Sequence, residues 1–524
     1  MGRSGSGSRL NRWFPSRRLR KANRRLAVPW TWSLLIRGLL GARESRSTAQ
    51  LYSARAKPMP HREIRRAPAG LGISRSVRWG VPGPWALTLK TVVGLAWPAV
   101  LEQLLNIVVD WTDAYLAGHL GTIALAAVGL SGQLTNLVAV FFGALGVGAT
   151  ALVARAVGAG DPEQAGRITL QALLSAGALG LVGMAFAYIG GPWLFAALGA
   201  EPAVSVAARV YLNIVALSFP AMAVLFVGNA ALRGAGDTLT PMRTWAVVVF
   251  TNAALAWVLA GSWGPFHLGV AGLGIAAALA RTLGAVLVGV RLWRGTSRLA
   301  LPHRGLRFEW DMLKRILRVG LPAGAEQLLL QLALLNLTGV ITALGTAAYA
   351  AHQIGLRVMS LSFLPGWGFA VAASTLTGQA LGARQPEAGR RATFSALFLA
   401  LALMGTMGLA LAVGGPLLVD LFTEDPEVID QGAAALRITA LIQPAMALSF
   451  VFSGALRGAG DTRYTLLITA TSIWIVRLPL AILFAHGLGW GLPGAWLGML
   501  ADFVVRALLF GWRFISGAWE RVHV

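Results

Sequence analysis

Long runs of apolar residues, separated by short polar breaks, follow one another from about residue 86 almost to the end of the chain. Each run is long enough to cross the hydrocarbon core of a membrane, which takes about 20 helical residues. The pattern therefore predicts an all-α polytopic membrane protein with twelve transmembrane helices. We expect these helices at residues 92–116, 123–156, 168–190, 203–231, 240–261, 267–290, 320–342, 347–379, 392–414, 429–455, 464–487 and 492–512.

The second half of this pattern repeats the first, 224 residues later. Pro220–Ala223 recurs as Pro444–Ala447, and Ala231–Thr238 recurs as Ala455–Thr462. A solenoid has units of about 20–50 residues, so this period indicates a duplicated half-protein, with two six-helix lobes. Duplicated hydrophobic halves are typical of secondary transporters, whose substrate site lies between the halves. The expected parts are an N-terminal tail (1–85), an N-lobe (86–290), a linker (291–318), a C-lobe (319–513) and a C-terminal tail (514–524).

The breaks between the predicted helices alternate in charge. One set has no Lys or Arg, whereas the other set carries residues such as Arg155, Arg233 and Arg457, and the 291–318 linker alone has eight basic residues. Basic loops of membrane proteins face the cytoplasm, so both termini are expected inside. We expect a monomeric, multi-pass protein of a bacterial inner (plasma) membrane, with the lipid bilayer as its environment.

The net charge of +24 is concentrated in the N-terminal tail. Residues 1–85 hold 19 Lys or Arg and two acids. Two interpretations remain open: a disordered basic arm beside anionic lipid headgroups, or a start site assigned too far upstream. We expect no nucleic-acid partner. The absence of cysteine excludes disulfides and thiolate metal sites.

Short motifs in the basic loops carry a family resemblance. Leu-Arg-Gly-Ala-Gly-Asp-Thr stands at 232–238 and again at 456–462, while Val157–Glu163 and Leu381–Glu387 follow the second and eighth helices. With Thr112–Gly121 at the end of the first helix, they resemble the multidrug and toxic compound extrusion (MATE) family of cation-coupled exporters, over about 92–512. Physically, the motif glycines permit a helix-ending turn, and its Asp and Thr can cap the next helix.

The first predicted helix carries an unusual polar stripe. Glu102, Asn106, Asp110 and Asp113 lie within about 80° of one another on the helix. An acid within a membrane is a functional candidate by default, and a carboxyl there could exchange a proton or bind Na⁺. Asp113 occupies the place of the family's functional aspartate, so the resemblance implies coupling there. Glu102 has a twin, Glu326, which leaves coupling and packing open, and Asp110 could simply lie near the outer headgroups.

The second half offers a different set of polar groups. Asp502 precedes Arg506 by one helical turn, and Arg477 lies near mid-depth in the eleventh helix. This favours either an ion pair that lets helices pack or an acid that is released in one conformation. Residues expected to line a cavity are Gln133, Asn136, Gln327, Gln331 and Arg477.

The chain also departs from the family. The resemblance implies cation-binding acids in the seventh and tenth helices of one branch, but Gln331 and Met446 stand near those places. In another branch an aspartate follows an Asn-x-x-Leu pattern, whereas here Asn252–Leu255 is followed by Ala256. Coupling is therefore expected at Glu102, Asp113 and Asp502, with H⁺ or Na⁺ as the ion and Asp113 as the possible Na⁺ site.

We expect a secondary exporter of small, cationic or amphipathic organic compounds, working by alternating access. No Gly-x4-Gly-Lys-[Ser/Thr] loop occurs, and we expect no enzyme activity, no catalytic residues and no cofactor. A flippase for lipid-linked precursors is the first alternative, kept open by Arg281, Arg357 and Arg477, although Arg281 and Arg357 are more simply structural. A passive channel or a non-transporting membrane protein is the second.

Overall fold

The computed structural model describes residues 85–261, 266–295, 299–302 and 307–522. The N-terminal tail therefore lies outside the described residues, apart from Trp85, as do parts of the 291–318 linker. The helices are α2 (Trp85–Leu120), α3 (Thr122–Gly158), α4 (Pro162–Ala197), α5 (Pro202–Ala216), α6 (Phe219–Gly234), α7 (Leu239–Ala260), α8 (Gly269–Trp293), α9 (Trp310–Thr342), α10 (Thr346–Gly382), α11 (Pro386–Asp420), α12 (Pro426–Gly458), α13 (Thr462–Thr471), α14 (Leu478–Ile482) and α15 (Gly491–Ile515), with short helical segments η1 (Ser472–Arg477), η2 (Leu483–Gly487) and η3 (Ala518–Arg521).

The predicted all-α membrane fold is confirmed. Within the described ranges, eleven helices are long and apolar enough to cross a membrane, and the bent pair α5–α6 makes a twelfth. Each falls on one predicted span. The largest difference is that α9 begins at Trp310, ten residues before its predicted start. The first turns of α9 contain the charged residues Asp311 and Lys314. A span predicted from the length of an apolar run leaves out such polar turns.

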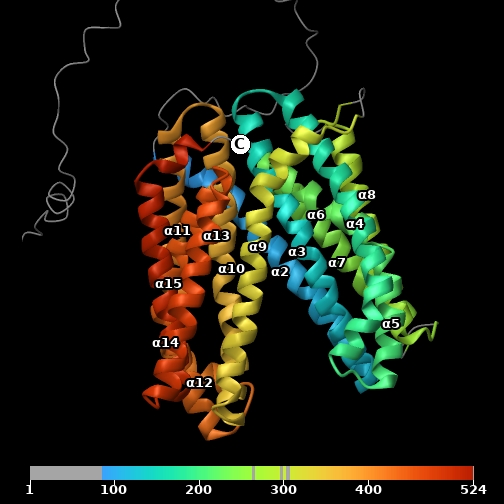
Figure 1. Ribbon diagram of the computed structural model, residues 1–524, viewed down its shortest axis with the longest axis vertical. Coiled ribbons are helices and arrows are strands. Elements are labelled where there is room, and N and C mark those ends of the chain that lie inside the picture. The colour runs from blue at the N-terminus through green and yellow to red at the C-terminus, as the bar shows by residue number, and fades with distance from the viewer. Residues whose placement is uncertain (1–84, 262–265, 296–298, 303–306, 523–524) are drawn as a thin grey trace, which may run out of the picture. The chain divides into compact units, whose positions relative to one another are not determined.

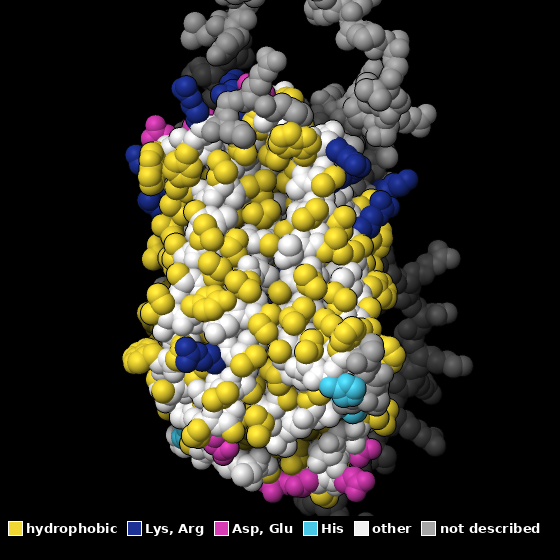
Figure 2. Space-filling model, turned by 90° about the vertical axis from the view of Figure 1, so that its right-hand side faces the viewer, with side chains coloured by type: hydrophobic (Ala, Val, Ile, Leu, Met, Phe, Trp, Pro, Cys, Tyr) yellow, Lys and Arg dark blue, Asp and Glu magenta, His cyan; other side chains and the backbone are white. Residues whose placement is uncertain are grey.

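Charge divides the ends of the helices into two sets. Arg155, Arg233 and Arg457 lie in the last turns of α3, α6 and α12, which we call the basic end. Glu424 and Asp425 of the loop before α12, with Glu427 in the first turn of α12, lie at the opposite, acidic end. Figure 2 shows Lys and Arg gathered toward the upper end and the largest group of acidic side chains at the lower end, with one basic patch below the middle and hydrophobic side chains in between.

The helices form two lobes, and α2 and α9 cross from one lobe to the other (Figure 1). At the basic end of α2, Val92 and Ala96 belong to the C-lobe core, whereas Val109 and Ala117 belong to the N-lobe core. The other helix, α9, does the reverse, with Ile316 in the N-lobe core and Ile341 in the C-lobe core. The ribbons of the two lobes come together at the basic end and separate toward the acidic end.

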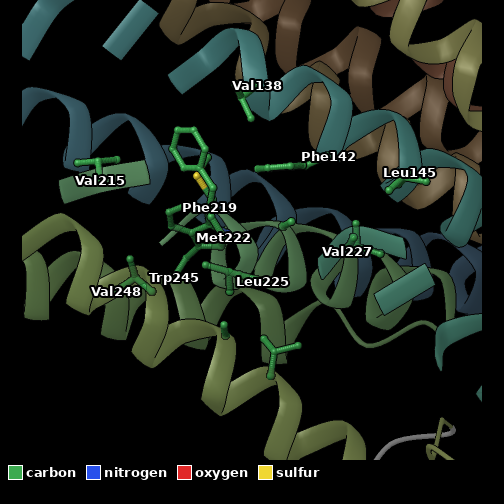
Figure 3. Close-up of a cluster of buried hydrophobic side chains, with 14 of the residues drawn as sticks. Val138, Phe142, Leu145, Val215, Phe219, Met222, Leu225, Val227, Trp245 and Val248 are labelled. Atoms are coloured by element: carbon green, nitrogen blue, oxygen red, sulfur yellow. The ribbon is translucent and has the colours of Figure 1, made fainter. Parts of the chain in front are cut away.

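The N-lobe core is built by apolar faces of α3, α5, α6 and α7 (Figure 3). Phe142 and Phe219 are fully buried there, against Met222 and Trp245. The predicted span 203–231 is broken in this core, since α5 and α6 meet at 55°. Its C-lobe counterpart α12 is continuous and contains Pro444, the twin of Pro220, so proline alone does not account for the break.

The eleventh span is irregular where the fifth is regular. Residues 462–487 comprise α13 and α14 with the π-helical segments η1 and η2 after each. A π-helical turn inserts an extra residue into the ladder and often marks a site with special side-chain requirements. Here η1 begins at Ser472 and ends at Arg477, and both of these residues bind Asp502.

Candidate functional site

An ion pair is present at the same place in both lobes. In the N-lobe, Arg233 Nη1 donates to Glu102 Oε1 at 2.6 Å. In the C-lobe, Arg457 Nη2 donates to Glu326 Oε1 at 2.8 Å. Each arginine is the one in the Leu-Arg-Gly-Ala-Gly-Asp-Thr motif, and each glutamate lies on the first helix of its half. The repeated motif therefore ties the first helix of a half to its fourth span.

The aspartate of the motif forms a second repeated ion pair. Asp237 Oδ2 lies 3.8 Å from Arg291 Nη2, and Asp461 Oδ2 accepts from Arg513 Nε at 2.8 Å. The arginines lie in the last turns of α8 and α15, so each motif also holds the sixth helix of its half. Asp237 also caps α7 by accepting from Thr240 N at 2.9 Å; Asp461 makes no such cap. The predicted cap is confirmed in the N-lobe and wrong in the C-lobe, where Arg513 takes the carboxylate.

Asp113 is buried in the half of the N-lobe toward the acidic end. Its Oδ1 accepts from Asn252 Nδ2 of α7 at 2.7 Å, and within the described part of the chain this is the only hydrogen bond of its side chain. Asp110, Arg281 and the buried Tyr211 lie within electrostatic range. Asp110 itself is exposed. The chain therefore collects two carboxylates, one amide and one guanidinium from α2, α7 and α8.

Several polar atoms of the N-lobe are buried without a partner among the described residues. They include Glu102 Oε2, Asn252 Oδ1 and Arg281 Nη1. Buried polar groups are normally hydrogen-bonded, so such exceptions point to a ligand, an ion or a change of state. Oxygen atoms from Asp113 and Asn252 are the ligand type that a hard cation prefers. Over the described ranges, no three His, Asp or Glu side chains gather in one group that could hold a metal ion.

The C-lobe uses its buried acid differently. Asp502 is fully buried and binds two arginines: Arg506 donates to Oδ1 and Oδ2 at 2.8 and 2.6 Å, and Arg477 binds Oδ2. Ser472 donates to the same carboxylate. The guanidinium groups of Arg477 and Arg506 also lie over the Phe503 ring, 5.5 and 5.3 Å from its centroid. The ion pair expected from the Asp502–Arg506 spacing is present, and Arg477 is part of it instead of lining a cavity freely.

The predicted cavity residues lie where α3 and α9 separate. Near the basic end the two helices touch: a Cβ atom at Gly320 would collide with the backbone of Ala144. Gln331 lies eleven residues beyond Gly320 toward the acidic end of α9, and Gln133 lies eleven residues from Ala144 in the same direction along α3. Eleven residues are about three helical turns, so both glutamines lie on the faces that touch near the basic end, and both are exposed. Asn136 and Gln327, also exposed, lie on the same stretches.

The lobes are latched together at the basic end. Arg155 Nη2 of α3 donates to Ala459 O, in the motif loop of the C-lobe, at 2.8 Å. Its twin Gln379 of α10 donates to Gly234 O, in the motif loop of the N-lobe, at 3.0 Å. Arg155 also donates to Val522 O near the C-terminus at 2.8 Å. Each lobe thus holds the backbone of the other lobe's motif loop.

The residues of the polar stripe predicted on α2 differ in how deeply they are buried. Glu102 and Asp113 point into the N-lobe and are buried, Asn106 is half-buried, and Asp110 is exposed. Sequence reasoning missed Asn252 as the partner of Asp113, and no short-range pattern links residues so far apart. It also missed the Glu102–Arg233 pair, although a signal existed, because both residues recur at the same offset in the second half.

Comparisons with known proteins agree with this geometry. A family model described as MatE matches residues 98–258 and again 322–483, once on each half. A protein of Thermotoga maritima named "Probable multidrug resistance protein NorM" is 33% identical over 435 residues, 82% of this chain and 93% of that protein. A protein of the same name from Rhodopseudomonas palustris is also 33% identical, over 82% of this chain and 92% of its own.

A solved structure described as the outward-facing conformation of a multidrug resistance MATE family transporter has a TM-score of 0.77 to this chain. It is 25% identical and is covered over 97% of its length, against 83% of this chain. The two family matches, the relatives and the shared fold lead to one conclusion: the chain belongs to the MATE family of multidrug efflux transporters.

Proposed function

We propose that this protein exports amphipathic organic cations across the inner membrane in exchange for H⁺ or Na⁺. The observation that carries the proposal is the buried Asp113 carboxylate, which has a single hydrogen bond within the described part of the chain, from Asn252. The exposed carboxylate of Asp110 stands one turn away on the same helix. A carboxylate with free acceptor positions can hold a proton, a sodium ion or the positive end of a substrate, but only one of them at a time. Relatives named as multidrug resistance proteins support the same class of substrate.

The charge of the loops supports an orientation with the basic end in the cytoplasm, and therefore with both termini inside. The latch made by Arg155 and Gln379 then closes the cytoplasmic side. The polar faces of α3 and α9 separate toward the outside. We infer that this arrangement belongs to an outward-facing state, in which an external ion would reach Asp113 and an exported compound would leave.

Exchange follows from competition for the same carboxylates. An H⁺ or Na⁺ that binds Asp113 from outside removes the negative charge that holds a cationic substrate, and so releases it. Return of the ion-loaded protein to the inward-facing state requires that the ion bind the two states with different affinity. One proton moving down 100 mV supplies about 2.3 kcal/mol, and one pH unit adds about 1.4 kcal/mol. Both contributions apply only to a neutral substrate; a singly charged cation exchanged for one proton moves no net charge, so each pH unit alone supports a gradient of about tenfold.

The flippase alternative needs free positive charge for a phosphate group. Of the three arginines that kept it open, one is paired with an acid and a second lies close to two acids. Arg477 binds Asp502, and Arg281 lies within electrostatic range of Asp110 and Asp113. Organic-cation export therefore fits the N-lobe better than transport of a lipid-linked phosphate.

Efflux from proteoliposomes tests the proposal. Vesicles loaded with ethidium are diluted into buffer that is more acidic outside, richer in Na⁺ outside, or matched to the interior. We expect one of the two ion gradients to accelerate efflux over the matched buffer, and an opposed gradient of the same ion to slow it. Efflux that is equal under all conditions would contradict ion exchange and would favour a passive channel.

A further inference from the structure

Arg357 is a charged residue of the central helices that the proposed mechanism does not use. It lies on α10, eleven residues from the helix start at Thr346, which is about 16 Å along the helix axis. Its side chain is exposed. Among the described residues its guanidinium has no hydrogen-bond or ion-pair partner, although the sequence favoured a structural role. An arginine at such a depth is costly unless it faces a partner or water.

The internal repeat shows which way Arg357 faces. Its twin is Gln133, which faces α9 across the space where α3 and α9 separate. In the second half, α10 takes the place of α3, and α2 takes the place of α9. A Cβ at Gly368 of α10 would collide with Val100 of α2 and lie 2.8 Å from Ala96 O, so these two helices touch near the basic end. Arg357 lies eleven residues from Gly368 toward the acidic end, about three turns, and therefore on the face turned to α2.

The helix opposite Arg357, α2, carries negative charge at about the same depth. Asp110 lies fourteen residues beyond Ala96 on α2, which is close to four full turns. It therefore lies on the side of α2 that faces α10, roughly one turn further out than Arg357. At this level α2 has already joined the N-lobe, as shown by the burial of Val109 in the N-lobe core. The carboxylate and the guanidinium stand on opposite lobes, and the described contacts include no ion pair between them.

We propose that Arg357 is a specificity-determining residue that binds the anionic group, a carboxylate, of an amphipathic substrate whose cationic group lies at Asp110 and Asp113. This rests on the proposed function and adds a second pole to its site. An arginine suits this role because its planar guanidinium can donate two parallel hydrogen bonds to one carboxylate. Recognition of both ends would favour a zwitterion over a cation of the same shape.

Two dyes of nearly identical shape test the inference. Rhodamine 110 carries a free carboxylate, and rhodamine 123 is its methyl ester, so both have the same cationic ring system. Binding of each dye to the purified full-length protein is measured by fluorescence anisotropy without any ion gradient. Arg357→Gln gives α10 the residue that its twin position already has. We expect this substitution to weaken the affinity for rhodamine 110 by about tenfold, as for the loss of one charge-assisted contact. The affinity for rhodamine 123 should stay within twofold of wild type.

Control variants separate this role from general effects. Arg463→Gln removes the same charge from an exposed position at the basic end and should change neither dye. Arg357→Lys should retain part of the preference, since it keeps the charge but not the fork. Equal weakening of both dyes by Arg357→Gln, or no change in either, would overturn the inference. Displacement of rhodamine 110 from wild type by phosphatidylglycerol would also overturn it, because Arg357 would then serve a lipid phosphate.

The outcome is distinguishable from failure of the proposed function. If wild type exports rhodamine 123 under an ion gradient but Arg357→Gln leaves the ratio of the two affinities unchanged, exchange stands and the role of Arg357 falls. If wild type binds neither dye, the role of Arg357 falls, whereas the proposed function is decided separately by the ethidium efflux.

Discussion

The N-lobe and the C-lobe derive from one repeat, yet they treat their buried acids in opposite ways. Glu326 of the C-lobe accepts from Arg457 and from two threonines, Thr465 and Thr469, so that both of its oxygens are used. Its twin Glu102 accepts from Arg233 and interacts with the Trp245 indole, while its Oε2 has no partner at close hydrogen-bond geometry among the described residues. The positions of the two threonines are occupied in the N-lobe by Pro241 and Trp245, neither of which supplies a hydroxyl group.

The clusters toward the acidic end extend this contrast. At the twin positions of Asp110, Asp113 and Asn252 the C-lobe has only apolar residues, namely Leu334, Leu337 and Val476. Conversely, Asp502 and Arg477 have no polar twin in the N-lobe, and their cluster is closed by two arginines and a serine. An acid whose oxygens are all bound keeps its charge in every state, whereas an acid with a free oxygen can exchange it. Under the proposed function, the comparison favours ion exchange in the N-lobe and structural ion pairing in the C-lobe.

The largest expected effect is on transport, through Asp113. Asp113→Asn keeps the shape of the side chain and a hydrogen bond to Asn252, but it can neither take up a proton nor neutralise Na⁺. We expect gradient-driven ethidium efflux to fall to the level of ethidium-loaded vesicles that contain no protein. The free energy of unfolding should change by less than about 1 kcal/mol. Asp430→Asn makes the same change at an exposed position near the acidic end and should export normally. Normal efflux from Asp113→Asn under both H⁺ and Na⁺ gradients would remove Asp113 as the exchanging group.

The second effect is on stability, through Asp502. Asp502→Asn leaves Arg477 and Arg506 buried with the whole negative charge of their partner removed, and breaking a buried pair in this way costs about 3–5 kcal/mol. We expect a lower thermal midpoint in detergent and reduced expression. The decisive measurement compares the thermal midpoint and the ethidium efflux of Asp502→Asn with those of Asp113→Asn. The two substitutions are chemically identical, so a difference reflects their surroundings. A stable Asp502→Asn protein that exports nothing would move exchange to the C-lobe and reverse the assignment.

The twin glutamates sharpen the comparison with an intermediate effect. Glu326→Gln disturbs three charge-assisted hydrogen bonds, which amounts to about 1–3 kcal/mol of stability, and should leave efflux per folded molecule nearly unchanged. Glu102→Gln disturbs one such bond and removes the free oxygen that could accept a proton. We therefore expect it to lower efflux several-fold with a smaller loss of stability. Thermal melts and efflux at matched protein levels check both variants, and the opposite ranking would contradict the division between the lobes.

Sequence and structure agree most closely where a pattern is long. The twelve spans follow from apolar length, because every stretch that crosses the bilayer must be about 20 residues long. The break at Ser218 and the π-helical segments beside Arg477 were missed. Both depend on how neighbouring helices pack, and neither changes the apolar pattern along the chain.

The candidate site was predictable only in part. Asp113 could be found, since an acid in an apolar span is conspicuous. Its partner Asn252 lies 139 residues away, and nothing local joins the two. The repeated Glu–Arg pairs were accessible in principle, because a residue that recurs in both halves tends to have a partner that recurs as well. Asp502 has no acidic counterpart in the other half, so the repeat does not reveal its partners; the spacing to Arg506 predicts one of them, and only the fold reveals Arg477 and Ser472.

The smallest expected effect concerns the latch. At this place the two lobes differ in one position: Arg155 of the N-lobe corresponds to Gln379 of the C-lobe. Arg155 and Gln379 hold opposite motif loops, but only Arg155 also reaches the C-terminal segment, at Val522 O. Arg155→Gln makes the two copies identical and removes the contact with Val522, a change of about 1–2 kcal/mol in favour of separating the lobes at the basic end. Because the chain has no cysteine, spin labels at residues 201 and 424 can report the distance between the lobes at the acidic end.

We expect Arg155→Gln to increase the population with a short distance between these labels about fivefold to thirtyfold relative to wild type, as that free energy implies. Gln379→Ala, which removes the other half of the latch, should act in the same direction and more weakly, because a neutral amide donor is lost instead of a charged one. A distance distribution that neither variant alters would mean that the close packing of Gly158 on Gln379 and of Gly382 on Arg155 holds the basic end closed without the hydrogen bonds.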